Sequence, residues 1–211
     1  MNSIFDEKIS RDLERIHNEA RRAAKVVENL LTFARRRGEP KKEYLDINEI
    51  LGRTLELRAY ELRTSNIELL VELSPGLPKI IGDFGQIQQV FLNIILNAEQ
   101  AMTEANGGGK LTIRTREVGG FIRISIVDDG PGILAGHFDK LFGPFFTTRG
   151  GKGGTGLGLS VCHGIITEHG GRIYAANKLE KGAIFFMELP VATEEMDDAK
   201  VAKKVSVRKG K

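Results

Sequence analysis

A change in apolar spacing at residues 35–40 divides the sequence into two parts. From Ile9 to Ala34, small and apolar residues recur alternately four and three positions apart with charged residues between them, which is a heptad repeat. A single helix cannot bury an apolar stripe of this kind by itself. We therefore expect the helix to pack against other helices in a bundle or across a dimer. The run Arg-Arg-Arg-Gly-Glu-Pro at 35–40 predicts the end of this helix, because basic residues, glycine and proline all favour helix termination in that order.

Beyond residue 40 the pattern alternates between helical and strand periods, which predicts an α/β domain. Asp46 or Asn48 can cap a first helix, and Asp83 can cap a second. The apolar positions of these helices are Ile50, Leu51, Leu55, Leu57 and Leu62 in the first, and Ile87, Val90, Phe91, Ile94, Ile95, Ala98 and Met102 in the second. A third helix is expected through 159–166, and strands at 67–73, 110–116, 121–127, 172–176 and 183–189. Val118, Gly119 and Gly120 should join the second and third strands as a hairpin.

The composition is that of a globular, intracellular chain. Cys162 is the only cysteine among 211 residues, so no internal disulfide can form. The charged start does not resemble a signal peptide, and no apolar run approaches the ~20 residues that span a bilayer. The net charge of +3 comes from six basic residues after position 199, which makes it weak evidence for a nucleic-acid partner. The tail from Glu194 onward lacks periodicity and is expected to be disordered or a linker.

Two asparagines inside the second helix are the first candidate for a binding site. Asn93 and Asn97 lie four positions apart and therefore on one face, opposite the apolar one. Asparagine is a poor helix former, so a pair of them suggests a polar task such as contact with a hard cation or with phosphate oxygens. Two solvated asparagines would give the same pattern.

A second candidate follows the strand at 121–127. That strand ends in Asp128 and Asp129, and Gly130 and Gly132 then allow a ligand to approach the backbone. A carboxylate at such a position suits recognition of an amine donor, for example the exocyclic amino group of adenine. An ordinary Asp-Gly turn remains the alternative explanation.

The third candidate is the glycine-rich stretch between Pro144 and Gly158, directly before a helix. Free N–H groups and the positive dipole end at a helix N-terminus can bind phosphate, and so many glycines predict a mobile lid. Gly151, Gly153 and Gly156 match a dinucleotide-binding fingerprint, but no strand precedes them; Lys152 is not followed by Ser or Thr, so the P-loop pattern also fails.

The order of these motifs resembles that of the N, G1, F and G2 boxes of bacterial two-component sensor histidine kinases. The matching segments are the Asn-x-x-x-Asn helix, the Asp-x-Gly-x-Gly turn, the paired-Phe segment and Gly-x-Gly-Leu-Gly-Leu. The resemblance spans about Asp46 to Pro190, and Leu-Leu-Thr-Phe-Ala-Arg is similar to the end of the second dimerisation helix. It implies a two-layer α/β sandwich of the Bergerat type, with a mixed sheet packed on three helices and preceded by a bundle helix. The implied domains are an incomplete dimerisation and phosphotransfer helix at 1–40, an ATP-binding domain at 41–192 and a tail at 193–211.

The resemblance also implies a role for each matching residue. Asn97 would coordinate Mg²⁺ and Asn93 would lie near the ATP phosphates, while Asp128 would bind adenine beside Gly130, Gly132 and Ile133. Arg149 and Lys152 are the local candidates for neutralising the negative charge of the γ-phosphoryl group. The lid residues would be Phe145, Phe146, Thr147, Thr148, Gly154, Gly156, Leu157, Gly158 and Leu159.

Two departures from related families affect the expected reaction. Related ATPases such as gyrase generally place a glutamate where Asn93 stands, and an amide cannot take a proton from water, so transfer of the phosphoryl group is favoured over hydrolysis. None of His17, His137, His163 and His169 has the acidic residue and proline that follow the phosphoacceptor in the resembled family. We read these four as surface or packing residues and expect the acceptor on a helix that this chain lacks.

The expected function is therefore ATP-dependent phosphorylation of that histidine in the cytoplasm, with relay to an aspartate of a response-regulator receiver domain. A homodimer through the bundle helix is expected, and nucleic acid is not. Two alternatives stay open: an ATPase of the same superfamily with a conformational cycle, and a degenerate nucleotide-binding scaffold.

Overall fold

The computed structural model describes residues 42–149 and 154–192, together with residues 9, 12, 13, 16, 17 and 20. The chain forms two compact units: Met1–Pro40 with Asp139–Val161, and Lys41–Phe138 with Cys162–Lys211. The larger unit contains the sheet and most of the predicted core.

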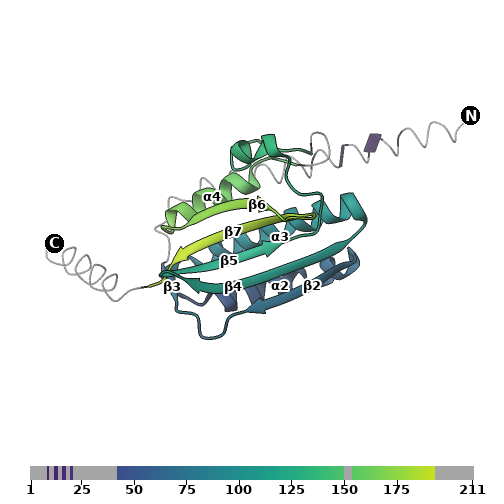
Figure 1. Ribbon diagram of the computed structural model, residues 1–211. Helices are drawn as coiled ribbons and strands as arrows, with labels where there is room; N and C mark the ends of the chain where they lie inside the picture. The colour runs from purple at the N-terminus through teal and green to yellow at the C-terminus, as the bar shows by residue number, and fades with distance from the viewer. Residues whose placement is uncertain are drawn as a thin grey trace, which may run out of the picture. The chain divides into compact units, whose positions relative to one another are not determined.

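A five-stranded mixed sheet forms the centre of the larger unit (Figure 1). Its strand order is β2-β4-β5-β7-β6, and the bounds are β2 Ile67–Leu73, β4 Gly109–Val118, β5 Phe121–Val127, β6 Arg172–Asn177 and β7 Ala183–Pro190. The β2–β4 pair is parallel and the other three pairs are antiparallel. The prediction of a mixed sheet is thus confirmed, and all five predicted strands are present.

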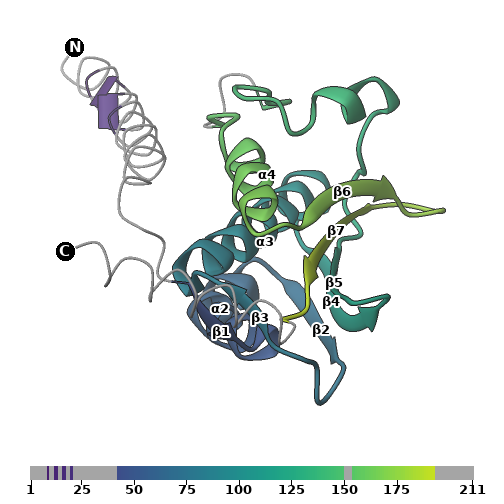
Figure 2. The same ribbon diagram turned by 90° about the vertical axis from the view of Figure 1, so that its left-hand side faces the viewer.

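Three helices, α2 (Ile47–Thr64), α3 (Phe84–Asn106) and α4 (Gly158–Glu168), lie on one face of the sheet (Figure 2). Alternate residues of the central strands point at them and are buried, for example Ile122, Ile124 and Ile126 of β5. This burial removes the apolar face of the sheet from water and gives the expected two-layer sandwich.

The helix α3 has the boundaries and the face that the sequence predicts. The Asp83 carboxylate caps it by accepting the N–H of Gln86 at 3.0 Å, and Gly107 ends it in the left-handed conformation at φ 72°. Its buried residues are Ile87, Val90, Phe91, Ile94, Ile95, Ala98 and Met102, which are the seven predicted apolar positions.

In α2, Asp46 is the cap and accepts the N–H groups of Asn48 and Glu49. Leu57 departs from the predicted apolar set, because its side chain is 61% exposed. Residue 57 follows Leu55 by two positions, or about 200° around the helix axis, so it lies away from the core-facing stripe.

Two elements were not predicted. The strands β1 (Glu43–Leu45) and β3 (Ile80–Gly82) pair antiparallel as a separate two-stranded sheet. Three residues are too few to show a strand period in the sequence. A 3-10 helix, Ala135–Lys140, follows the turn after β5, and no apolar periodicity in the sequence predicts it.

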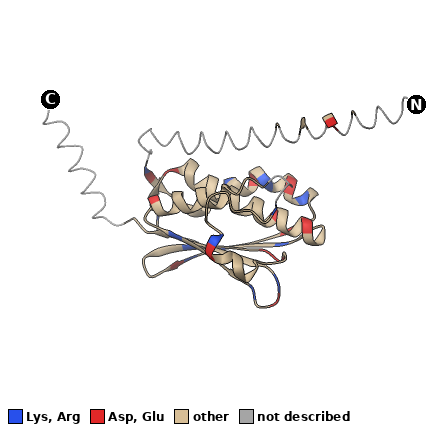
Figure 3. Ribbon diagram, turned by 90° about the horizontal axis from the view of Figure 1, so that it is seen from above, with Lys and Arg blue, Asp and Glu red and all other residues tan. Residues whose placement is uncertain are grey.

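The face of the sheet away from the helices carries a network of ion pairs and hydrogen bonds. The Glu188 carboxylate of β7 is 1% exposed and binds Arg123 of β5 at 2.5 Å, and also Arg172 and the Tyr174 hydroxyl of β6. One buried acidic side chain therefore connects three strands. Across the described helices, acidic and basic positions are interspersed (Figure 3).

Some predictions concern residues outside the described ranges. Of the heptad positions, the structure describes Ile9, Leu13, Ile16 and Ala20, which are helical and exposed. The end of that helix and the tail at 193–211 lie outside the described residues. In the described part of the chain, no helix has the length and apolar character needed to cross a membrane.

His169 is a packing residue whose ring nitrogens are both used. Its Nε2 accepts the backbone N–H of Asp83 at 3.1 Å, so Nδ1 carries the proton and donates to the Ile165 carbonyl at 2.7 Å. The ring is buried, and Gly82 packs so closely on it that a Cβ there would lie 2.7 Å from the ring.

We expect His169→Ala to destabilise the protein by about 2–4 kcal/mol, because it leaves a cavity and unpaired buried polar groups. Urea denaturation would measure this loss. Thr167→Ala on the exposed side of α4 is the control and should change stability by no more than about 0.5 kcal/mol. Equal effects of the two substitutions would contradict the structural role of His169.

Candidate functional site

Asn93 and Asn97 lie on α3 beside its buried stripe, and both side chains are half-buried. The four-residue spacing puts both carboxamides on one side of the helix. Each takes part in interactions within the protein. The two asparagines share one side of the helix, but they lie beside the buried stripe rather than opposite it as the sequence predicted.

One neighbour of Asn93 is Cys162 of α4. The Cys162 thiol is fully buried, lies 3.8 Å from the carbonyl oxygen of Val90, and interacts with the Asn93 side chain. Burial raises the pKa of this thiol to about 12, although the hydrogen bond with Asn93 opposes the rise. Cys162 is thus an unreactive, protonated thiol at neutral pH, and it contacts a predicted site residue.

Asp128 lies at the end of β5, and its carboxylate is almost completely buried, with 4% of the residue exposed. Oδ1 accepts two backbone N–H groups, from Gly130 at 2.9 Å and from Ala183 at 3.2 Å. Both of these hydrogen bonds go to Oδ1 and neither goes to Oδ2. The carboxylate is therefore fixed through one oxygen and retains an acceptor at the other.

Desolvation by burial raises the pKa of Asp128 above its ordinary value of 3.8. The hydrogen bonds from Ala183 and Gly130 oppose this rise, and the nearby charge of Asp129 adds to it. Because the folded state disfavours the ionised form, the Asp128 charge lowers the stability of the fold at any pH above both of its pKa values.

The turn after Asp128 packs on α3 and on the β6–β7 hairpin. A Cβ on Gly130 would lie 3.5 Å from the Cβ of Ala101, one turn after Asn97 on α3. Gly182 of the hairpin passes so close to Asp128 that its own Cβ would lie 2.9 Å from the Asp128 carbonyl carbon. The Asp128 turn and the asparagine pair are thus carried by directly contacting segments.

Sequence reasoning missed Asn177, the last residue of β6. Its side chain forms two hydrogen bonds of 2.7 Å with the backbone of Ile133: Oδ1 accepts the N–H and Nδ2 donates to the carbonyl oxygen. The only local signal is an asparagine at a strand end, which usually marks a turn. Nothing in the spacing links it to a residue 44 positions earlier.

The predicted lid residues all lie in the smaller unit, where two segments approach closely. Phe145 has a positive φ of 64° and is 70% exposed, and Gly156, with φ 66°, passes directly against its backbone. A Cβ on Gly154 would collide with Thr147 Oγ1, which accepts the N–H of Arg149 at 3.1 Å. Glycine is required at 154 and 156 because the two segments touch there.

The structure divides the predicted residues between its two units. The larger unit contains Asn93, Asn97, Asp128, Gly130, Gly132 and Ile133. The smaller unit contains Phe145, Phe146, Thr147, Thr148, Arg149, Gly154, Gly156, Leu157, Gly158 and Leu159. Lys152 lies outside the described residues.

The donor chemistry in the larger unit fits a purine nucleotide with a divalent ion. Mg²⁺ prefers oxygen ligands, and the carboxamide oxygen of Asn97 is one. The buried Asp128 carboxylate with one uncommitted oxygen suits an amine donor. Gly130 and Gly182 allow the chain to pass closely against Asp128, where a side chain would collide with it.

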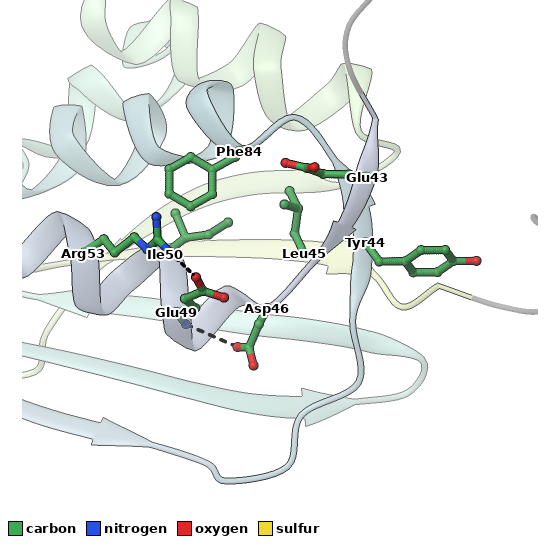
Figure 4. Close-up of a pocket in the computed structure, with 8 residues that line it drawn as sticks. All are labelled: Glu43, Tyr44, Leu45, Asp46, Glu49, Ile50, Arg53 and Phe84. Atoms are coloured by element: carbon green, nitrogen blue, oxygen red, sulfur yellow. Dashed lines mark hydrogen bonds and ion pairs between the residues drawn. The ribbon is translucent and has the colours of Figure 1, made fainter.

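A pocket of about 430 Å³ lies elsewhere in the larger unit, at the first turns of α2 and α3 (Figure 4). Its charged side chains have local roles: Asp46 caps α2, and Glu49 pairs with Arg53 at 2.7 Å. The Arg53 guanidinium lies 5.4 Å from the centre of the Phe84 ring. None of the predicted site residues lines this pocket.

We expect Asp128→Asn not to destabilise the fold at pH 7, and to stabilise it by up to about 1 kcal/mol, or 2–4 °C in Tm. The reason is that the amide keeps an acceptor at the position of Oδ1 and removes the desolvated charge. The difference from the unsubstituted protein should shrink as the pH falls through the raised pKa and vanish below 3.8. Thermal unfolding from pH 3 to pH 8 would measure it. A stability difference between the two proteins that grows as the pH falls would contradict the conclusion that burial disfavours the Asp128 charge.

Comparison with known proteins gives the family. Residues 82–193 match the model of the histidine kinase-, DNA gyrase B- and HSP90-like ATPases. The sensor kinase CckA of Brucella abortus (strain 2308) is 37% identical over 210 residues, which cover 92% of this chain and 22% of CckA. The chain spans less than two thirds of the length of the curated relatives that it matches.

Solved structures agree with this match. Full-length ShkA in complex with AMPPNP has a TM-score of 0.69 and 29% identity, covering 80% of this chain and 36% of that one. Histidine kinase ThkA in complex with the response regulator protein TrrA has a TM-score of 0.69 and 28% identity, covering 88% and 52%. The chain therefore belongs to the histidine kinase-, DNA gyrase B- and HSP90-like ATPases, and within them to the catalytic domains of sensor histidine kinases.

Proposed function

We propose that this chain binds Mg²⁺ and ATP and transfers the γ-phosphoryl group to a histidine that is not among its own four, for relay to an aspartate of a response regulator. The observation that carries the proposal is the Asp128 carboxylate, buried and fixed through Oδ1, with Oδ2 left as an acceptor. The relative ShkA, crystallised with AMPPNP, supports a nucleotide ligand.

Asp128 would select adenine. Its available oxygen can accept a hydrogen bond from an exocyclic amine, whereas the oxo group of guanine at the same place would face a carboxylate. That mismatch would be costly once the bound base excluded water from Oδ2, because neither group would then have a hydrogen-bond partner. Ile133, whose backbone is fixed by Asn177, would contact the base with its side chain.

Asn97 would hold the ion and Asn93 would lie near the same phosphates. A bound Mg²⁺ neutralises phosphate charge and favours in-line transfer. The chain's part is to orient the phosphates: α3 supplies two carboxamides on one side, and Arg149 and Lys152 are the basic residues offered by the glycine-rich segment. Phe145, Thr147, Thr148 and residues 154–159 would cover the nucleotide.

The amide at position 93 favours transfer over hydrolysis. An amide cannot accept a proton from water, and its contact with the protonated Cys162 thiol provides no base in its place. A neutral histidine nitrogen needs no such base, because it is already nucleophilic near pH 7.

The acceptor would be a histidine of a separate helix. His169 is buried and uses both ring nitrogens, so it has no nitrogen left for a phosphoryl group. His17, His137 and His163 lack the flanking residues expected of an acceptor. The heptad helix at 1–40 would join that helix in a homodimeric bundle, with the ATP-binding domain at 41–192 and the tail at 193–211 following, in a cytoplasmic setting.

The complex of ThkA with TrrA supports a response-regulator partner. The next step would pass the phosphoryl group from the histidine to a receiver aspartate. We propose no nucleic-acid role, since the net positive charge comes from the last thirteen residues alone.

We expect Asn97→Ala to abolish the Mg²⁺-dependent part of AMPPNP binding, because the carboxamide oxygen that would ligate the ion is removed. Calorimetric titration with and without Mg²⁺ would measure it. Thr103→Ala, an exposed position on the same helix, is the matched control and should bind as the unsubstituted chain does. Unchanged affinity of Asn97→Ala would refute the ligand role.

The reaction itself is tested by supplying the acceptor in trans. The chain, incubated with Mg²⁺, γ-labelled ATP and a separate dimerisation domain that contains a phosphoacceptor histidine, should transfer label in an acid-labile, base-stable linkage. Steady release of inorganic phosphate without labelled acceptor would instead favour an ATPase. Nucleotide binding with neither product would favour a scaffold role.

A further inference from the structure

We propose that Asn177 is a positioning residue that fixes the base end of the nucleotide site by holding the backbone of Ile133. This inference rests on the proposed function and adds a residue that no motif of the sequence includes. Asn177 belongs to the edge strand β6, far in sequence from the Asp128 turn that it would control.

The contact is a two-point clamp. Asn177 Oδ1 accepts the Ile133 N–H and Nδ2 donates to the Ile133 carbonyl oxygen, both at 2.7 Å. A side-chain amide that pairs with both polar groups of one residue reproduces the exchange between hydrogen-bonded partners in a β-ladder. Only a carboxamide supplies a donor and an acceptor in this geometry, because aspartate offers acceptors alone.

The clamp acts on a segment with little other support. In the described part of the chain, the hydrogen bonds of Ile133 are the two to Asn177. The preceding Gly132 is in the left-handed region at φ 78°, and the following residues 134–136 are exposed. Without the clamp, this stretch would have several accessible backbone conformations, and Ile133 would not keep one position.

The same hairpin holds the other end of the turn. Asn177 and Ala183 are cross-strand partners in the β6–β7 register, and Ala183 donates its N–H to Asp128 Oδ1 at 3.2 Å. One cross-strand pair therefore fixes the acidic residue that would read the amine and the apolar residue that would contact the ring. The Lys181 ammonium adds a bond of 2.7 Å to Asn106, at the end of α3.

Selectivity for the base should then depend on Asn177, although its side chain would not touch the nucleotide. Loss of the clamp would leave Asp128 in place through Gly130 and Ala183, but would release Ile133. The site would lose shape complementarity to adenine while keeping its phosphate contacts.

The test compares Mg²⁺-AMPPNP and Mg²⁺-GMPPNP binding to the full chain and to Asn177→Ala by calorimetry. Asn177→Ala should weaken AMPPNP about fivefold to tenfold, the scale of one hydrogen bond, and should weaken GMPPNP less, so that the ratio of the two affinities falls. Leu179→Ala, at a fully exposed position of the same hairpin, is the control and should leave both affinities unchanged.

Thermal unfolding of each variant separates positioning from mere stability. A lower Tm with an unchanged affinity ratio would overturn the inference and leave the proposed function intact. If Asn177→Ala does not fold, Asn177→Asp, which keeps the acceptor for the Ile133 N–H, takes its place and should lower the ratio by a smaller factor. An unsubstituted chain that binds neither nucleotide refutes the proposed function, and the inference falls with it.

Discussion

The buried carboxylate of Asp128 is the constraint on which the arrangement of this domain depends. Burial disfavours its charge, and two backbone N–H groups compensate in part through a single oxygen. For those groups to converge, β5 must end where β7 begins, and Gly182 must pass without a side chain. The antiparallel order of β5, β7 and β6 is thus the framework that fixes the position of the Asp128 carboxylate.

The domain uses charge at one position and avoids it at another. At 128 a carboxyl group is retained although burial disfavours its charge, and in the proposed function an amine donor of the ligand would pair with its second oxygen. At 93 the side chain is a neutral amide, in contact with a thiol whose pKa is raised to about 12. In the proposed function, recognition of the base would need a fixed acceptor, whereas transfer of a phosphoryl group to a nitrogen would need no base near the phosphates.

Local signals in the sequence were sufficient for the helices and the long strands. The α3 boundaries follow from the Asp83 cap and Gly107, and its buried face follows from a repeated apolar spacing. The β1–β3 pair was not predictable, since three-residue strands have no period and their pairing is a tertiary contact. Asn177 was missed for a related reason: its partner lies 44 residues away, so the function of the side chain exists only in the folded chain.

The base end of the site therefore depends on the register of an edge strand, and that register is fixed from the opposite face of the sheet. Glu188 of β7 binds Arg172 and Tyr174 of β6 and also Arg123 of β5, so it connects the strands that carry Asn177, Ala183 and the turn at Asp128. A slip of β6 by one residue would turn Asn177 to the wrong face, and a slip by two would carry it about 7 Å along the strand, out of reach of Ile133. The Glu188 network and the Asn177 clamp thus act together: the network fixes the register of β6, and the clamp at the end of β6 holds the backbone of Ile133.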